Sequence, residues 1–412
     1  MRVKSHTLNS MIELNTPEYR KIAFGLALGS FIVFCNLYVV QPMLPFMAAH
    51  FSISSTTANW LFASATLALS LCLVPWAIAS ERFGRRRILF IGLISLPIVS
   101  LAMSVNGSWW MLLTGRAVIG VAIAAFASVA VAYMVEELSP SAFSAAIGSY
   151  IAANSLGGIS GRIIGGTLTD SLGWQGALIV VGALSTIGVA ITYKLVPAQR
   201  NFEPKRQGFA QHNRSIITHI RTPIVWVAML IGGVNFALFV NLYSVMGFRL
   251  VAPPYSLPIS LVSLIFICYL GGTISSKLTT NWRHHFSEIS GMLVGSSISL
   301  FGMVVALYPH LSAMLLGLCC ISFGAFFTHT LAYGWVSQHA KTAKATATAL
   351  YLVHYYIGGS IGGFFLLLCW QHGGWASVVV GGSVLFALLF VLILRLRYLS
   401  YEPKTMKSHT NA

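Results

Sequence analysis

Several ionisable side chains lie inside long apolar segments of this chain, where they could carry charge or protons. An ionisable group in hydrocarbon is costly unless it is paired or hydrated, so each one is a candidate functional residue. His329 and His354 are two of them, and an imidazole can take up and release a proton near neutral pH. Phe326 and Tyr333 share a helix face with His329, because they lie three and four residues from it. The alternative is that each histidine only forms a packing hydrogen bond.

The scarcity of acidic residues sharpens this prediction. The chain has nine Asp and Glu residues, and none falls near the middle of an apolar segment. If protons drive a process here, histidines or acids at segment ends, such as Glu136, Glu137 and Glu288, must carry them. Arg116 lies a turn or two inside its own apolar segment and would bias the charge of His329; alternatively, it extends its charge toward the interface. The predicted proton-coupling residues are therefore His329, His354 and Arg116.

Uncharged polar side chains form a second group of candidates. They occur in two apolar segments that lie far apart in the chain, and they could orient a substrate without selecting for charge. The alternative for each is a hydrogen bond between neighbouring helices. These residues are Asn36, Tyr38 and Gln41 in the first segment, and Asn235, Asn241 and Tyr243 in the other.

The sequence lacks the motifs of several other kinds of chemistry. The six cysteines lie mostly in apolar stretches and are not spaced as metal ligands, so we expect packing roles and no metal site. No phosphate-binding Gly-x-x-x-x-Gly-Lys-Ser/Thr loop occurs, which excludes an ATP-driven pump. Neither a nucleophile–base pair nor paired carboxylates suggest an enzyme. We therefore expect a protein that is not an enzyme and that binds no cofactor.

The elements that must position these residues are membrane helices. The chain has 412 residues, of which 56% are hydrophobic, and a mean hydropathy of +0.78, which is more apolar surface than a soluble fold can bury. Apolar stretches of about 20 residues have the length of a membrane span. Twelve are predicted, at 22–47, 57–79, 88–105, 111–135, 144–168, 175–195, 223–246, 257–277, 287–308, 311–336, 344–369 and 375–395.

The basic residues indicate how these helices are oriented. Of the 25 Lys and Arg residues, 22 fall on one side of the predicted topology, the side that also holds both termini. By the positive-inside rule this side is cytoplasmic. The net charge of +16 is therefore explained by short loops and tails rather than by nucleic-acid binding. The polar stretch 197–222 predicts a cytoplasmic linker, and no cleavable signal peptide is expected before the first span.

The two halves of the chain resemble each other. Residues 34–38 match 239–243 as Phe-x-Asn-Leu-Tyr. Tyr150, Gly157, Gly158, Gly161, Gly173 and Trp174 match Tyr351, Gly358, Gly359, Gly362, Gly374 and Trp375 at a constant offset of 201. Two such matches half a chain apart indicate a duplicated six-helix unit.

The segment 81–87, Glu-Arg-Phe-Gly-Arg-Arg-Arg, connects the second and third predicted helices. It resembles the corresponding loop of major facilitator superfamily transporters, Gly-x-x-x-Asp-Arg-x-Gly-Arg-Arg, with Ala77 and Glu81 in place of the first glycine and the aspartate. We expect Arg82 or Arg85 to contact Glu136 or Glu137, and Glu81 to approach the start of segment 344–369 when the inside is closed. The predicted cytoplasmic gate comprises Glu81, Arg82, Gly84, Arg85, Arg86, Glu136 and Glu137.

Two further segments carry the resemblance. Arg116, Gly120 and Ala124 are similar to a helix-4 pattern that the family's exporters associate with proton transfer. Glycines four apart in helix 5 lie on one face and allow close helix packing, for which we expect helix 8 as the partner, and helix 2 as the partner of Gly358 and Gly362. Their spacing resembles the antiporter signature Gly-x-x-x-Gly-Pro-x-x-Gly-Gly, with arginine at the proline position. The predicted seam is Gly157, Gly161, Arg162, Gly165 and Gly166.

The resemblance extends over nearly the whole chain and is strongest to the YnfM-type inner-membrane exporters of the drug/proton antiporter branch. The stretches 37–45, 136–140, 149–151 and 154–162 carry it. It implies an all-α polytopic fold of twelve transmembrane helices in two six-helix repeats. The implied organisation is an N-terminal bundle at 1–196, a linker at 197–222, a C-terminal bundle at 223–396 and a cytoplasmic tail at 397–412. In this family helices 1, 4, 7 and 10 line a central cavity. The predicted cavity residues are Asn36, Tyr38, Gln41, Arg116, Asn235, Asn241, Tyr243, Phe326, His329 and Tyr333.

The function implied is a secondary active transporter of the inner (plasma) membrane. It exports small hydrophobic or amphipathic compounds by alternating access, uses the proton gradient, lies in the lipid bilayer as a monomer and binds no nucleic acid. One alternative is a facilitator or importer of a neutral polar solute such as a sugar. Another is a membrane receptor or scaffold that transports nothing; this would need an extramembrane domain, and no loop is long enough to form one.

Overall fold

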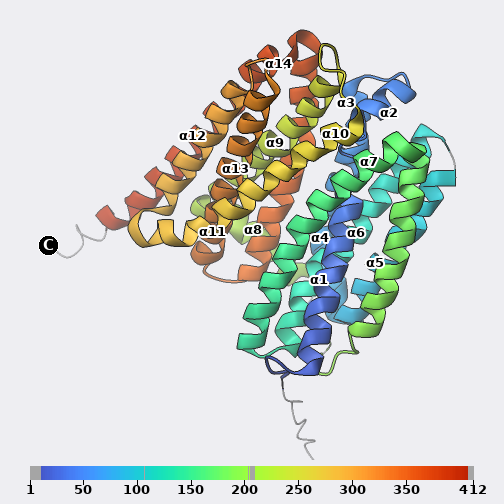
Figure 1. Cartoon of the computed structure of the whole chain (residues 1–412). Helices are drawn as coiled ribbons and strands as arrows, with labels where there is room; N and C mark the ends of the chain where they lie inside the picture. The colour runs from blue at the N-terminus through green and yellow to red at the C-terminus, as the bar shows by residue number, and fades with distance from the viewer. Residues whose placement is uncertain (1–10, 106, 203, 205–208, 407–412) are drawn as a thin grey trace, which may run out of the picture.

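The computed structural model describes residues 11–105, 107–202, 204 and 209–406, and the fold is all-α (Figure 1). Parts of the predicted linker (203 and 205–208) and tail (407–412) lie outside the described residues. The helices are α1 (Pro17–Tyr38), α2 (Leu44–His50), α3 (Ser55–Ala58), α4 (Trp60–Phe83), α5 (Arg85–Val105), α6 (Trp109–Glu137), α7 (Pro140–Leu195), α8 (Phe209–Ile220), α9 (Pro223–Val251), α10 (Ile259–Ser263), the 3₁₀ helix η1 (Leu264–Cys268), α11 (Tyr269–His285), α12 (Glu288–Val305), α13 (Leu311–His339) and α14 (Lys344–Met406).

Ten helical segments of the described chain are long and apolar enough to span a membrane. Two of these are too long for one crossing, because 20 residues of helix already span about 30 Å. Helix α7 has 56 residues and breaks at Gly173, where φ is 71°; α14 has 63 residues and breaks at Gly373 and Gly374, where φ of Gly374 is 59°. Positive φ favours glycine, so each break turns one long helix into two spans. This gives the twelve predicted spans.

The boundaries depart from the prediction in three places. The first span ends at Tyr38, and a turn at 39–43 precedes α2, because Pro42 and Pro45 cannot continue the hydrogen-bonded helix. The predicted span 257–277 begins as α10 and η1 before it becomes α11. The predicted linker contains α8, a helix of 12 residues.

The helices form two groups, which we call the N-half (α1–α7) and the C-half (α9–α14) (Figure 1). Within the N-half, α1 packs on α7 and α6 packs on α4 and α5; within the C-half, α9 packs on α14 and α12 packs on α13. Small residues permit this close packing: a Cβ added at Gly120 would meet the carbonyl of Ala65 in α4, and one at Gly324 would meet the carbonyl of Gly295 in α12.

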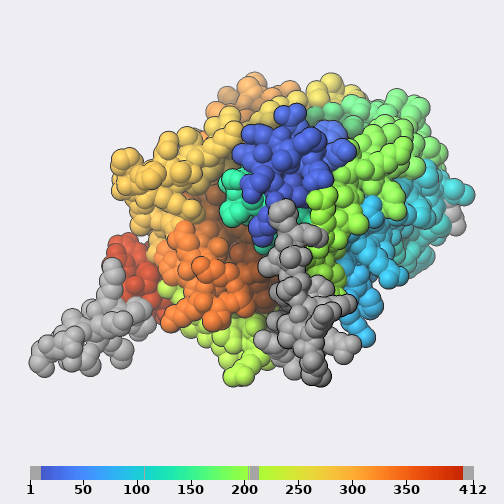
Figure 2. Space-filling view, turned by 90° about the horizontal axis from the view of Figure 1, so that it is seen from below, coloured from blue at the N-terminus to red at the C-terminus, as the bar shows by residue number. Residues whose placement is uncertain are grey.

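The two ends of the molecule differ. The upper end in Figure 1 carries α2, α3 and α10, and the lower end carries the start of α1 and the connection between α4 and α5. The halves contact each other through α3, α4 and α14, through α7 and α10, and through α2 and α9. Seen from the lower end, the surface is hollowed between the two halves (Figure 2). The structure is therefore closed at the upper end and open at the lower end.

Candidate functional site

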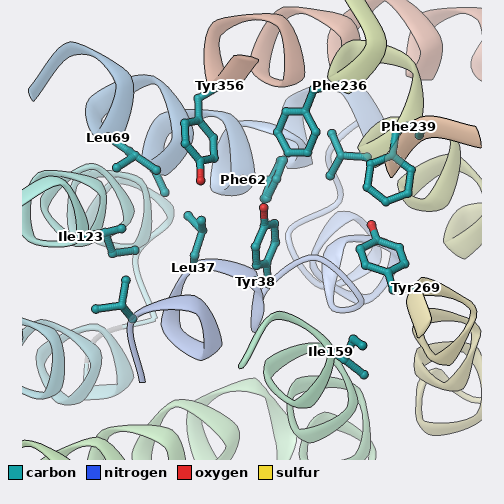
Figure 3. Close-up of a cluster of buried hydrophobic side chains, with 14 of the residues drawn as sticks. Leu37, Tyr38, Phe62, Leu69, Ile123, Ile159, Phe236, Phe239, Tyr269 and Tyr356 are labelled. Carbon is teal, nitrogen blue, oxygen red and sulfur yellow. The ribbon is translucent and has the colours of Figure 1, made fainter. Parts of the chain in front are cut away.

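Aromatic side chains of both halves meet between the two groups of helices (Figure 3). The ring of Phe239 lies 4.8 Å from that of Tyr269 and 5.2 Å from that of Phe326, and the ring of Phe236 stacks on Tyr355 at 3.8 Å. We call these five residues, together with Tyr38 of the N-half, the aromatic wall. Tyr38, Phe236, Phe239 and Tyr269 are buried in this state. Aromatic faces of this kind suit flat or amphipathic molecules, because they offer much apolar area.

Arg162 of α7 lies at the upper end of this wall and is 1% exposed. The centre of its guanidinium lies 3.7 Å from the ring of Tyr38, 4.6 Å from that of Tyr269 and 4.8 Å from that of Phe266. Its Nε donates to Gln41 Oε1 at 2.7 Å, Nη1 to the Gly158 carbonyl at 2.8 Å and Nη2 to the Tyr269 hydroxyl at 3.4 Å. Because Phe266 and Tyr269 belong to the C-half, this cation connects the two halves.

Gln41 extends the connection. Its Nε2 donates to the Val240 carbonyl and to Ser244 Oγ, both at 2.9 Å, in α9 of the C-half. The sequence predicts Gln41 in the cavity and Arg162 in a glycine seam, but not that the two form one cross-half network. The available signal was the charge itself, since arginine stands where the resembled signature has proline.

His329 lies on the C-half side of the aromatic wall. Its Nδ1 is 2.9 Å from the hydroxyl of Tyr351, and its ring centre lies 4.5 Å from that of Tyr355 and 6.1 Å from that of Tyr333. His354, the other predicted proton carrier, instead directs Nδ1 to the Leu350 carbonyl of its own helix at 2.8 Å. Both histidines are half-buried; they differ in that the partner of His329 lies on another helix, α14, whereas that of His354 lies on its own helix.

The prediction that Arg116 lies in the cavity and biases the charge of His329 is not met by its position. It is 1% exposed, and its guanidinium donates to the carbonyls of Asn36 (2.7 Å), Leu37 (2.6 Å) and Leu61 (2.9 Å), all in the N-half. The carbonyl of Asn36 is free to accept because α1 ends two residues later, at Tyr38. Arg116 therefore stabilises the end of α1 rather than lining the site.

Two of the polar residues predicted to line the cavity also hydrogen-bond within their own halves. Asn36 donates to the Ile32 carbonyl and Ser185 Oγ and accepts from Ser100, all within the N-half, whereas Asn241 donates to the carbonyls of Ala237 and Gly359. Each asparagine therefore hydrogen-bonds within its own half.

The remaining pair behaves similarly. Asn235 donates to the Ala325 carbonyl at 2.9 Å and Tyr243 to the Leu318 carbonyl at 2.8 Å, both in α13. All four residues are nearly fully buried. Hydrogen bonding between helices, the alternative considered for them, is what the structure contains.

The glycine seam has a different partner from the one predicted. A Cβ added at Gly157 or Gly161 would meet the backbone of α1 at Phe31 or Cys35, and one at Gly165 would meet the carbonyl of Val39, directly after α1. Only Gly166 faces the C-half, where an added Cβ would meet Ser263 of α10. Likewise Gly358 and Gly362 face Gly233 and Ala237 of α9 rather than the second predicted span, which is α4. These seams join helices of the same half because each glycine fits against the backbone of a neighbouring helix. The spacing of the glycines alone does not specify which helix that neighbour is.

Two side chains close the upper end, and neither was predicted. Asp170 Oδ2 accepts from the backbone N–H of Ser260, at the start of α10, at 2.7 Å. Gln371 lies 201 residues later and donates to Ser55 Oγ at 2.9 Å and Thr56 Oγ1 at 3.3 Å, at the start of α3. With its amide turned over, its oxygen accepts from the N–H groups of Ser55 and Thr56 instead. Each residue thus binds a helix start of the other half.

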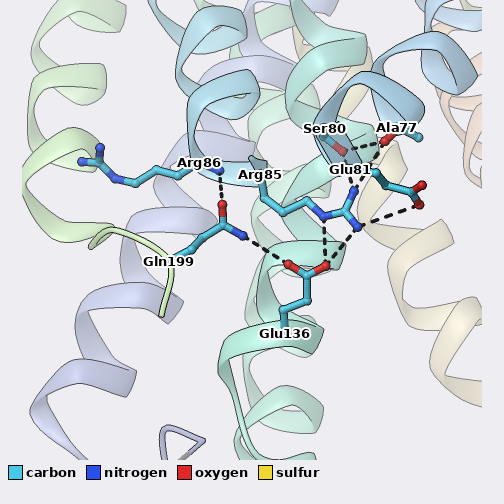
Figure 4. Close-up of polar contacts among 7 residues, drawn as sticks. All are labelled: Ala77, Ser80, Glu81, Arg85, Arg86, Glu136 and Gln199. Atoms are coloured by element: carbon cyan, nitrogen blue, oxygen red, sulfur yellow. Dashed lines mark hydrogen bonds and ion pairs between the residues drawn. The ribbon is translucent and has the colours of Figure 1, made fainter. Parts of the chain in front are cut away.

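At the lower end the predicted gate residues form a network inside the N-half (Figure 4). Arg85 Nη2 lies 2.9 Å from Glu136 Oε1 and 4.0 Å from Glu81 Oε1. The first of these is the predicted contact between the loop and the end of α6. Gln199 joins Glu136 Oε2 to the backbone N–H of Arg86. The approach of Glu81 to α14 belongs to a state closed at this end and stays a prediction.

Other gate residues hold the segment after α7. Glu137 accepts from the backbone N–H groups of Arg200 and Asn201 at 2.9 and 3.0 Å. Arg86 donates to the Val196 carbonyl, and Gly84 connects α4 to α5 with φ of 97°. Arg82 lies over the ring of Phe83. The gate residues therefore fix the start of the linker as well as the loop.

This arrangement of two helical groups around an aromatic site defines a class of membrane transporter. The family model of the Major Facilitator Superfamily matches residues 26–363, and the chain belongs to that family. This confirms the predicted family and the all-α polytopic fold, and it identifies a membrane transporter of small molecules rather than an enzyme.

Individual relatives and structures agree with this assignment. The chain is 32% identical over 381 residues to the uncharacterized MFS-type transporter YybF of Bacillus subtilis (strain 168), covering 92% of this chain and 94% of that protein. It is 29% identical to the inner membrane transport protein YnfM of Escherichia coli (strain K12), covering 94% and 93%. A bacterial homologue of the human lysosomal transporter Spinster, solved in an inward-facing and occupied conformation, superposes with a TM-score of 0.74 at 16% identity, covering 93% and 98%.

Proposed function

We propose that this protein is a proton-coupled exporter of small hydrophobic or amphipathic compounds in the bacterial inner membrane. The observations that carry the proposal are the aromatic wall between the halves and a hollow that is open at one end of the molecule and closed at the other. A single such site, reached alternately from each side, is the basis of alternating access. The spacing of the glycines in the first part of α7 supports export, because the drug exporters of the family share this spacing.

The orientation follows from the distribution of charge. The lower end carries the basic segment 81–87 and the start of the linker, so we place this end and both termini in the cytoplasm. The hollow then opens inward, and the bundles 1–196 and 223–396 move relative to each other about the linker 197–222. Because both halves of the site come from one chain, we propose that the monomer is the working unit.

His329 is the proposed proton carrier. It lies on the wall that a cargo would contact, and its hydrogen bond to Tyr351 couples its charge to the packing of α13 on α14. A carrier needs a group whose charge changes the relative stability of two states. A histidine at this place meets that need without a carboxylate near the middle of the membrane.

Inverted membrane vesicles test the proposal. A hydrophobic fluorescent dye should accumulate in vesicles that contain the protein when the interior is acidified, and collapse of the pH gradient should release it. His329→Gln should abolish the gradient-driven component, whereas His354→Gln, which loses only a bond within its own helix, should retain it. If wild type accumulates the dye equally with and without the gradient, proton coupling is contradicted. If wild type takes up the dye in right-side-out vesicles and not in inverted ones, export is contradicted.

A further inference from the structure

We infer that Arg162 is an anion-binding site and that the cargo of this carrier is an amphipathic compound bearing one carboxylate. This inference rests on the proposed function, because it names the chemical class of the exported compound.

The charge of Arg162 is balanced by neutral groups alone among the described residues. Its hydrogen-bond acceptors are an amide oxygen, a backbone carbonyl and a hydroxyl. The ion pairs formed by the described residues involve Arg85, Arg200 and Arg283. Asp170, two turns further along α7, is engaged with Ser260. A buried cation held without a carboxylate is costly, so an anion that reaches it gains more than it would at an exposed arginine.

Arg116 is the matched comparison within the same half. It is buried to the same extent, yet its three acceptors are carbonyls of α1 and α4, so its surroundings stay intact when the halves separate. Arg162 instead lies against Phe266 and Tyr269 of the C-half and reaches α9 through Gln41. Any opening at the upper end must therefore remove some of its partners.

The guanidinium retains donor capacity for an anion. Of its five N–H donors, three take part in the hydrogen bonds described, and the bond to the Tyr269 hydroxyl is long at 3.4 Å. The rings of Tyr38, Tyr269 and Phe266 lie within 3.7–4.8 Å of the guanidinium centre. A carboxylate that approaches in the guanidinium plane can accept two donors at once and keep these ring contacts.

The rest of the cargo is defined by the aromatic wall. Ring contacts continue from Tyr269 to Phe239 at 4.8 Å, from Phe239 to Phe236 at 6.3 Å and from Phe236 to Tyr355 at 3.8 Å, beside His329. Phe236, Phe239 and Tyr269 are buried in this state, so a flat apolar body lies along these rings, with its carboxylate on Arg162, once the halves separate. This geometry selects an aromatic carboxylate over a neutral compound of the same shape.

Binding at Arg162 also has a conformational consequence. The carboxylate competes with Gln41 and Tyr269 for the guanidinium, and both groups tie the N-half to the C-half. Replacing them weakens the closure of the upper end, so the anion binds the upper-open state more tightly than the closed one. A ligand shifts a conformational equilibrium only through such a difference in affinity.

The experiment measures binding of 2-naphthoate and its neutral isostere 2-naphthamide to purified protein in detergent by quenching of tryptophan fluorescence. Wild type should bind the naphthoate about tenfold more tightly than the amide, as expected for a charge-assisted hydrogen bond. In Arg162→Gln the two affinities should become equal. In Arg249→Gln, a matched control for a buried arginine that donates to the carbonyl of Ala306, the tenfold preference should remain.

Two further variants test the inference if thermal unfolding shows that Arg162→Gln does not fold. Arg162→Lys should keep a reduced preference, and Tyr269→Phe, which removes only a competing hydroxyl, should retain or increase it. The inference is overturned if wild type binds neither probe, if its two affinities agree within twofold, or if a folded Arg162 variant keeps the full preference. Since no gradient is present, these results are independent of the transport assay: failed proton-driven export leaves the preference intact, and an absent preference leaves export intact.

Discussion

The first part of α7 (140–172) and the first part of α14 (344–372) are repeat mates that pack alike and differ in chemistry. Gly157 and Gly161 approach the backbone of α1 in the same way that Gly358 and Gly362 approach the backbone of α9. One residue further on, however, the N-half has Arg162 where the C-half has Gly363, which lies against Asn59 and Asn241. The duplication has kept the backbone packing and changed the side chain at the boundary between the halves.

A second pair of mates keeps its role but not its charge. Asp170 and Gln371 each bind a helix start of the opposite half, one as a carboxylate and the other as an amide. Repeat symmetry thus specifies where contacts form, whereas the departures from it, at 162 and 170, concentrate charge on the N-half side.

Substitution of the shared glycines should have the largest effect. Gly161→Ala and Gly362→Ala each place a methyl group against backbone that cannot move aside, which should lower the free energy of unfolding by about 1–3 kcal/mol. Gly148→Ala in the same α7, where nothing lies within 4 Å of an added Cβ, should be neutral or slightly stabilising. Thermal unfolding in detergent measures this; a strong effect at only one of the two mates would break the packing equivalence.

Substitution of the cross-half arginine should act on conformation more than on folding. Arg162→Gln removes a cation that contacts three rings and three acceptors, so the upper end should open more often. Labelling of a cysteine that replaces Ser263, which is buried where the C-half meets Gly166, should become about tenfold faster, the ratio expected when about 1.4 kcal/mol of closure is lost. The six native cysteines must be removed first, and unchanged labelling would show that Arg162 does not hold the closure.

The upper-end mates should give a smaller and graded response. Asp170→Asn keeps the acceptor but loses the charge beside the start of α10, an interaction of about 0.3–1 kcal/mol, so the same labelling should rise about twofold to fivefold. Gln371→Glu should have the opposite effect, because it adds a negative charge at the start of α3. A response of the same sign from both variants would show that the two mates do not share a role.

The smallest effect is expected at the lower end. Arg85 is buried, but its partner Glu136 is partly exposed and both lie within one half, so the coupling between them should be about 0–1 kcal/mol of unfolding free energy. A double-mutant cycle with Arg85→Gln and Glu136→Gln measures the coupling. A coupling above this range would place the pair among the main supports of the N-half, contrary to the comparison.

Much of the fold could be predicted because length and hydropathy decide membrane helices locally. The twelve spans and the duplicated glycines followed from composition and spacing, whereas the end of α1 at Tyr38 departs from the predicted span 22–47. The contact of Arg85 with Glu136 followed too, because loop length leaves the arginine few acids to reach.

The site was harder to predict because it depends on which way buried polar groups turn. Asn36 and Asn241 occupy matching places in the sequence but bind different neighbours, and Arg116 binds the carbonyls left free at the end of α1. Neither periodicity nor depth in the membrane specifies those partners. Arg162 was visible as a charge at an unexpected position, but its cage is built from Tyr38, Phe266 and Tyr269, which the chain brings together only on folding.

The central claim is that the halves open alternately around a site whose upper closure depends on Arg162. Paired spin labels test it most directly, one pair across the upper end at Ser171 and Leu261 and one across the lower end at Ser141 and Ala345, all exposed positions. On addition of 2-naphthoate, the distance distribution of the upper pair should shift to longer values while that of the lower pair shortens, and Arg162→Gln should lengthen the upper pair without ligand. Distances that stay fixed in both pairs, or that lengthen together, would contradict the account.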